Sequence, residues 1–178
     1  SKGEFISGDE GKLILKSAEK EDFKFATVDK LGSYKKDESL LKKHIDAIIK
    51  DELVDAGSIK KKNFKVVVDA VNSTGAIAVP ALLKALGVTD IIVLNEEVTG
   101  NFAHNPEPLP EHLSDLSNEV MKHKAHLGIA VDPDVDRLCF VCEDGSMFGE
   151  EYTLVDVADY VLGLKKGNTV SNLSSTRA

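Results

Sequence analysis

The sequence of 178 residues predicts an α/β protein with three layers, in which helices cover both faces of a mixed, mainly parallel sheet. Two observations predict this fold class. Short runs rich in Val, Ile and Leu alternate along the chain with longer amphipathic stretches of helical period. Most of the apolar runs also end in turns rich in Asp, Asn, Ser or Gly. Regular alternation of strand and helix is typical of sheets whose parallel strands are joined by helical crossovers.

A polar amino-terminal part precedes the first strongly periodic element. Residues 1–32 lack sustained periodicity apart from a short helix expected at 8–18, so we expect a tail or connector there. Residues 38–53 predict an amphipathic helix, because five large aliphatic side chains recur at helical spacing. These side chains are Leu41, Ile45, Ile48, Ile49 and Leu53.

The elements of the predicted sheet follow in order. The expected strands are 64–69, 90–94, 127–131, 138–142 and 169–173. The expected helices are 76–86, 111–124 and 152–164. Pro110 is well placed to open the second of these helices, because proline is favoured in a first helical turn. Pro80 should kink the first helix or mark its true start.

One loop carries the strongest functional signal. The third apolar run leads directly into Asp132-Pro133-Asp134-Val135-Asp136-Arg137. Alternate side chains of an extended backbone point the same way, so the three carboxylates are expected to converge. A hard divalent cation, best matched by Mg²⁺, would neutralise them. Ligands of α/β sheets bind at the carboxyl ends of strands, where this loop lies, and Asp132, Asp134 and Asp136 are therefore predicted metal ligands.

The loop also has three alternative interpretations. A solvated acidic turn without a ligand is the simplest. An EF-hand is disfavoured by Arg137 at the sixth position, where glycine is needed, although Glu143 falls at the twelfth. A haloacid-dehalogenase phosphatase would use Asp132 as nucleophile, but Asp136 and the hairpin after it depart from that family. The phosphatase and a non-catalytic metal-binding module stay as alternatives.

The Asp132–Arg137 loop resembles the metal-binding loop of the α-D-phosphohexomutases, the phosphoglucomutase/phosphomannomutase superfamily, whose pattern is close to Asp-Gly-Asp-Gly-Asp-Arg. Further segments resemble that family in order and spacing, namely 66–75, 80–83, 86–87, 100–102, 105–108 and 171–175. The resemblance covers roughly residues 35 to 178. It implies a sheet like that of the family's second domain.

The resemblance also implies a domain organisation. Residues 1–32 would be the tail of a first domain or a linker, residues 33–145 a second domain with the metal-binding loop, and residues 146–178 the truncated start of a third. The chain begins at Ser1 without methionine and ends at Ala178, shortly after residues 174–176, which could cap a helix. We therefore expect a piece of a longer protein.

The resemblance implies a chemistry as well. A phosphoserine would donate its phosphoryl group to a hexose 1- or 6-phosphate, and a bisphosphorylated sugar would return the other phosphate. Asp132, Asp134 and Asp136 match the Mg²⁺ ligands of the family, and Arg137 matches the arginine beside the phosphoserine. Pro133 and Val135 replace the usual glycines without loss of a ligand.

The nucleophile of the family is not in this chain. The family motif is Thr-Ala-Ser-His-Asn-Pro, and the nearest segment here is 102–106. Ala103 stands before His104 in that segment and has no hydroxyl to phosphorylate, so His104 is interpreted as a loop histidine. The chain alone is therefore expected to be inactive. The sugar, whether glucose, mannose or glucosamine, stays open, and no substrate-binding residue is predicted.

The charge and the hydrophobic pattern of the sequence argue against nucleic acid and membrane as partners. The formal net charge of −8 argues against a nucleic-acid-binding face, which would need clustered basic residues. The apolar runs fall short of the ~20 residues of a membrane span. The two cysteines, Cys139 and Cys142, lie within a predicted strand and give no disulfide framework. We expect a cytoplasmic protein that binds neither nucleic acid nor membrane. The resemblance implies a phosphosugar as the partner of the full-length protein.

Overall fold

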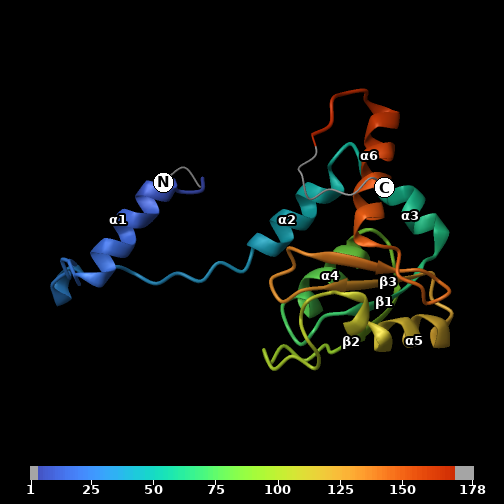
Figure 1. Ribbon diagram of the computed structural model, residues 1–178, viewed down its shortest axis with the longest axis horizontal. Coiled ribbons are helices and arrows are strands. Elements are labelled where there is room, and N and C mark those ends of the chain that lie inside the picture. The colour runs from blue at the N-terminus through green and yellow to red at the C-terminus, as the bar shows by residue number, and fades with distance from the viewer. Residues whose placement is uncertain (1–3, 171–178) are drawn as a thin grey trace. The chain divides into compact units, whose positions relative to one another are not determined.

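The computed structural model describes residues 4–170, and these fall into two units, Ser1–Asp37 and Glu38–Ala178 (Figure 1). The first unit contains α1 (Gly8–Glu19) and a short 3₁₀ helix, η1 (Val28–Lys30). Ser7 caps α1, because its hydroxyl accepts a hydrogen bond from the Glu10 N–H while the Glu10 carboxylate accepts one from the Ser7 N–H. The helix expected at 8–18 is confirmed.

The second unit is built around a four-stranded sheet with the order β2-β1-β3-β4. The strands are β1 (Lys65–Asp69), β2 (Asp90–Leu94), β3 (Leu127–Val131) and β4 (Leu138–Val141). The central strand β1 pairs in parallel with both β2 and β3, whereas β4 returns antiparallel to β3. The mixed, mainly parallel sheet is confirmed.

Helices cover both faces of this sheet (Figure 1). α4 (Gly75–Ala85) packs on one face, where α3 (Ala56–Lys62) contributes Ile59, and α5 (Ser114–His123) packs on the other. Val66 and Val68 of β1 belong to the core on the α4 side, and Val67 between them belongs to the core on the α5 side. Alternate side chains of β1 therefore face two different cores, which is why its three middle residues, 66–68, are all valines.

Two further helices flank this core. α2 (Leu40–Ile49) packs against α4, and α6 (Glu150–Leu164) packs against β4. No helix within residues 4–170 combines the length and the apolar character that crossing a membrane requires.

The helix predicted at 38–53 is shorter than expected and is followed by one that was not predicted. α2 ends at Ile49, and α3 begins after Asp55, whose carboxylate accepts a hydrogen bond of 2.9 Å from the Ser58 N–H. That cap starts a new helix at Ala56. α3 then ends at Asn63, which adopts a left-handed conformation.

The structure limits the roles predicted for the two prolines singled out in the sequence. Pro80 does not mark the start of its helix, because α4 begins five residues earlier at Gly75. Pro110 opens only the 3₁₀ helix η2 (Pro110–His112). The predicted continuous helix at 111–124 is wrong, because Leu113 leaves helical geometry to bury its side chain in the core before α5 starts.

The carboxyl-terminal elements agree in part. α6 starts two residues before the predicted 152, and β4 ends one residue before the predicted 142. Within the strand predicted at 169–173, residues 169 and 170 are not in a strand, and 171–173 lie outside the described residues. The domain boundaries at 32/33 and 145/146 stay predictions, although the unit division after Asp37 falls near the first of them.

Gly75 is the point where α4 approaches β3 most closely. A Cβ at this position would lie 2.5 Å from Cγ2 of Val131, the last residue of β3. We expect Gly75→Ala to lower the free energy of unfolding by about 1–3 kcal/mol, because the packed core cannot yield without moving helix or strand. Urea denaturation of the chain measures this change.

Gly163→Ala is the matched control, because a Cβ at Gly163 in α6 meets nothing within 4 Å. This variant should be neutral or stabilising by up to about 1 kcal/mol, since alanine favours helix over glycine. Equal effects of the two substitutions would contradict the close approach of α4 to β3.

Candidate metal centre

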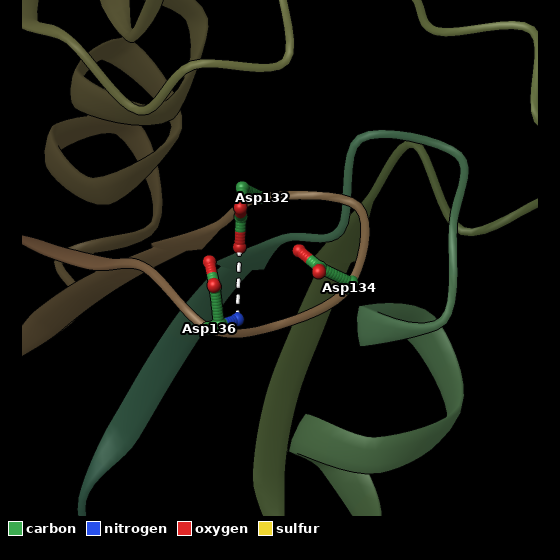
Figure 2. Close-up of side chains that lie close together, drawn as sticks. All are labelled: Asp132, Asp134 and Asp136. Carbon is green, nitrogen blue, oxygen red and sulfur yellow. Dashed lines mark hydrogen bonds between the residues drawn. The ribbon is translucent and has the colours of Figure 1, made fainter. Parts of the chain in front are cut away.

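The three aspartates of the predicted metal loop lie in the hairpin that joins β3 to β4. Val131 and Leu138 are paired across the two strands, so residues 132–137 form the whole connection. Figure 2 shows the side chains of Asp132, Asp134 and Asp136 pointing from different sides of this loop into a shared space. One carboxylate oxygen from each lies within 4.8 Å of the others. The predicted convergence is confirmed.

The three carboxylates converge for a different reason from the one expected from the sequence. Alternation along an extended backbone does not produce it, because Val135 adopts a left-handed conformation with φ of 63° and the chain curls back. Asp132 Oδ1 accepts hydrogen bonds from the backbone N–H groups of Asp136 and Arg137, each at 3.0 Å. The buried Asp132 carboxylate thus closes the loop around itself.

A second set of hydrogen bonds fixes the loop to its neighbour. The hydroxyls of Ser73 and Thr74, in the turn between β1 and α4, both donate to the carbonyl oxygen of Pro133, at 2.8 and 2.7 Å. β1 and β3 are parallel neighbours, so their carboxyl ends meet at this edge of the sheet. A left-handed β-branched residue is strained, and the bonds at both ends of the loop hold Val135 in that state.

The donor set fits a small hard cation. Three carboxylates are oxygen ligands of the kind that Mg²⁺ prefers, and two oxygens on opposite sides of a bound Mg²⁺ lie about 4.2 Å apart. The carboxylate oxygens in the loop lie within 4.8 Å of one another, and the exposed side chains of Asp134 and Asp136 can adjust by rotation. Asp132 is 6% exposed and is the fixed member of the set.

The electrostatics of the loop favour a bound cation. A side-chain hydrogen bond with Asp132, and then the negative charges of Asp134 and Asp132, raise the pKa of Asp136 above its usual range. The neighbouring carboxylates therefore penalise the ionised form of Asp136. A cation would remove this penalty.

Arg137 follows the loop and is also held by a second acidic residue. Its Nη1 forms an ion pair with the carboxylate of Glu107, and its Nε lies 4.0 Å from Oδ1 of Asp136. A cavity of about 200 Å³ opens beside this pair and is lined by six residues, Glu107, Pro108, Leu109, Arg137, Leu138 and Cys139. The guanidinium thus bridges the metal loop and the proline-rich loop before α5.

A buried polar cluster occupies the same edge of the sheet. Asp69, the last residue of β1, is 2% exposed, and its carboxylate accepts hydrogen bonds from the Val71 N–H and from the side-chain amide of Asn95. The His104 ring approaches the other oxygen of Asp69, with Nε2 2.9 Å from Oδ2. His104 lies in a loop, as the sequence predicted, and its ring also contacts the buried carboxylate at the end of β1.

Sequence reasoning missed this cluster and Glu107. The position of Asp69 at the carboxyl end of a parallel strand was an available signal. Nothing in the local sequence links Asp69 to His104, which is 35 residues away, or Arg137 to Glu107, which is 30 residues away.

Residues 42–145 match the family model described as "Phosphoglucomutase/phosphomannomutase, alpha/beta/alpha domain II". This match spans the sheet and the metal loop. The chain belongs to the phosphoglucomutase/phosphomannomutase family. The superfamily predicted from the sequence motifs is confirmed, as is the fold class.

Individual members of the phosphoglucomutase/phosphomannomutase family are similar over most of this chain. A "Phosphoglucomutase/phosphomannomutase" from Thermococcus kodakarensis is 38% identical over 80% of this chain and 30% of its own length. A "Probable phosphoglucosamine mutase" from Methanopyrus kandleri is 34% identical over 79% of this chain and 30% of its own.

A solved structure agrees with these relatives. The crystal structure of a phosphoglucomutase/phosphomannomutase family protein from Burkholderia thailandensis superimposes with a TM-score of 0.72 at 30% identity, over 89% of this chain and 32% of that protein. The chain thus spans about a third of the length of the relatives that it matches. The metal ligands and the role of Arg137 stay predictions.

The raised pKa of Asp136 predicts an effect on stability. A group whose pKa is raised by folding contributes stability at low pH, and this contribution is lost as the pH rises through the folded pKa. Without divalent cations at about pH 7, Asp136→Asn should therefore raise the thermal midpoint, and the difference should shrink toward about pH 4 as the native carboxyl takes up its proton. Circular dichroism melting curves in EDTA measure both.

Asp159→Asn on α6 is the control for a simple change in net charge. If it raises the midpoint as much as Asp136→Asn does, or if Asp136→Asn lowers it, repulsion within the loop is not the cause.

Proposed function

We propose that this chain supplies the Mg²⁺-binding part of a phosphohexomutase, which interconverts hexose 1-phosphate and hexose 6-phosphate through a phosphoserine and a bisphosphorylated sugar. The observation that carries the proposal is the convergence of Asp132, Asp134 and Asp136 in the β3–β4 hairpin, inside the region that matches the family's second domain. Three acidic ligands at the carboxyl edge of the sheet suit an enzyme that handles phosphoryl groups.

The residues of the loop have separate roles in this proposal. Asp132 is held by two backbone N–H groups and would provide the fixed ligand, while Asp134 and Asp136 would close on the cation from the exposed side. Bound Mg²⁺ would supply positive charge to offset the charge of a phosphoryl group in transfer. Arg137 would bind a phosphate oxygen through its N–H donors, for which a guanidinium is suited.

The remaining parts of the reaction are assigned outside this chain. The serine motif of the family does not occur in the sequence, and no residue here is proposed as nucleophile. The substrate is proposed only as a class, a hexose phosphate. The relatives described above are named as a phosphoglucosamine mutase and as a phosphoglucomutase/phosphomannomutase, and no residue is proposed here to select among the sugars.

The phosphatase alternative has less support. As nucleophile, Asp132 would have to reach a phosphorus atom, but its side chain is buried and its Oδ1 already accepts two backbone hydrogen bonds. The burial and the hydrogen bonds of Asp132 favour a role as a metal-coordinating residue that also organises the loop.

A phosphohexomutase would convert a hexose 1-phosphate into the 6-phosphate, whereas a phosphatase would release inorganic phosphate. We expect the 178-residue chain alone to convert no glucose 1-phosphate, because it lacks the phosphoserine motif.

A polypeptide that carries this chain together with the family's other domains should isomerise at least one of the glucose, mannose and glucosamine 1-phosphates, with Mg²⁺. Asp134→Asn should lower its kcat/KM by about 100-fold or more, since loss of even a residue supporting a ligand costs about 10–100-fold. A coupled assay of the 6-phosphate measures this.

The controls separate the alternatives. Asp159→Asn should leave the rate unchanged. Turnover of glucose 1-phosphate by the 178-residue chain alone would overturn the division of roles. Release of inorganic phosphate, in place of the 6-phosphate, would favour the phosphatase. Cation-dependent stabilisation without turnover by either protein would favour a non-catalytic metal-binding module.

A further inference from the structure

Arg137 forms its ion pair with Glu107 although it lies beside the acidic metal loop. Arg137 directly follows the three aspartates of the metal loop in the sequence, and opposite charges at about 4 Å attract appreciably near a protein surface. Yet the guanidinium contacts Glu107, and only its Nε comes within 4.0 Å of Asp136. Glu107 therefore competes with the metal loop for this arginine.

Glu107 is built to hold its position. It stands between Pro106 and Pro108, whose rings fix the backbone on both sides. Its own N–H donates a hydrogen bond of 3.1 Å to the side-chain oxygen of Asn105. Exposed ion pairs contribute little mainly because two mobile side chains must be ordered, and here the backbone of one partner is already ordered.

The segment that carries Glu107 is also fixed to the sheet. His104 Nδ1 lies 2.7 Å from the carbonyl oxygen of Asn105, and His104 Nε2 lies 2.9 Å from the buried Asp69 carboxylate. Asn105 in turn accepts from Glu107. A continuous set of hydrogen bonds thus runs from the carboxyl end of β1, through His104 and Asn105, to the residue that pairs with Arg137.

The contact leaves a usable part of the guanidinium. Arginine has five N–H donors, and the Glu107 contact in the structure is made through Nη1. Nε and Nη2 form the adjacent edge, and two donors on one edge are what a bidentate contact with a phosphate requires. Without Glu107, the guanidinium could turn these donors onto Asp134 and Asp136, where they would also compete with a cation.

We propose that Glu107 is a positioning residue that holds Arg137 beside the metal loop, with Nε 4.0 Å from Asp136, and keeps the guanidinium from turning fully onto the carboxylates, so that it can bind a phosphate while the carboxylates bind a cation. The identity of the anion as a phosphoryl group rests on the proposed function. The placement of Arg137 by Glu107 does not.

The first test measures the order of the Arg137 side chain. In ¹⁵N relaxation of the arginine Nε–H groups of the full chain, Glu107→Gln should increase the mobility of Arg137 or shift its resonance toward that of a carboxylate-bound arginine in the metal loop. Glu111→Gln removes the same charge four residues further along and should change neither. An unchanged Arg137 signal in Glu107→Gln would overturn the proposal.

The second test measures the affinity of inorganic phosphate in the presence of Mg²⁺, followed by ³¹P chemical shift. Removing a negative charge should by itself tighten anion binding. Loss of positioning should weaken it, and we expect Glu107→Gln to bind phosphate about two- to fivefold more weakly. Unchanged or tighter binding would contradict the positioning role.

A double-mutant cycle shows whether Glu107 acts through Arg137. In an Arg137→Met background, Glu107→Gln should no longer weaken phosphate binding, because the residue that it positions is absent. An effect as large as in the wild type would assign Glu107 a role independent of Arg137 and overturn the proposal.

The outcomes also separate this inference from the proposed function. If Arg137→Met binds phosphate as well as the wild type does, the phosphate role of Arg137 fails, and with it that part of the proposed function. The relaxation measurement then decides the placement of Arg137 by Glu107 without any phosphate. If phosphate binding depends on Arg137 but not on Glu107, the proposed function stands and the positioning role is wrong.

Discussion

The carboxylate of Asp132 is the group on which the rest of the site depends. It is buried at the carboxyl end of β3, and its two hydrogen bonds to the backbone of Asp136 and Arg137 set the course of the hairpin. The direction of the other two carboxylates and the position of the arginine both follow from that course. The sheet contributes by bringing the β1–α4 turn beside the loop, where Ser73 and Thr74 bind the Pro133 carbonyl.

This arrangement places several unfavourable features at one edge of the sheet. Three carboxylates converge, and Val71 and Val135 are both β-branched residues in left-handed conformations. Each feature costs stability, and the surrounding hydrogen bonds hold it in place. Unfavourable features of this kind are typical of sites where a bound ligand offsets them. The proposed ligands are a cation in the loop and a phosphate near Arg137.

Much of the fold could be predicted from local sequence, because β1 to β4 are short β-branched or apolar runs bounded by turn residues. The break before α3 depended on one side-chain cap at Asp55, and the break at Leu113 on burial in the core, neither of which periodicity reports. The three aspartates were recognisable from their spacing, although a curled loop, and not an extended one, brings them together. Glu107 and Asp69 could not be assigned, because their partners are about 30 residues distant and meet them only in the folded chain.

The central claim is that Asp132, Asp134 and Asp136 bind one divalent cation. Crystals of the chain soaked in Mn²⁺, which replaces Mg²⁺ at oxygen sites and gives an anomalous signal, test it directly. The account predicts a single anomalous peak within about 2.3 Å of an oxygen from each aspartate, and its absence in Asp134→Asn. A peak at other acidic side chains with none in the β3–β4 hairpin would contradict the claim.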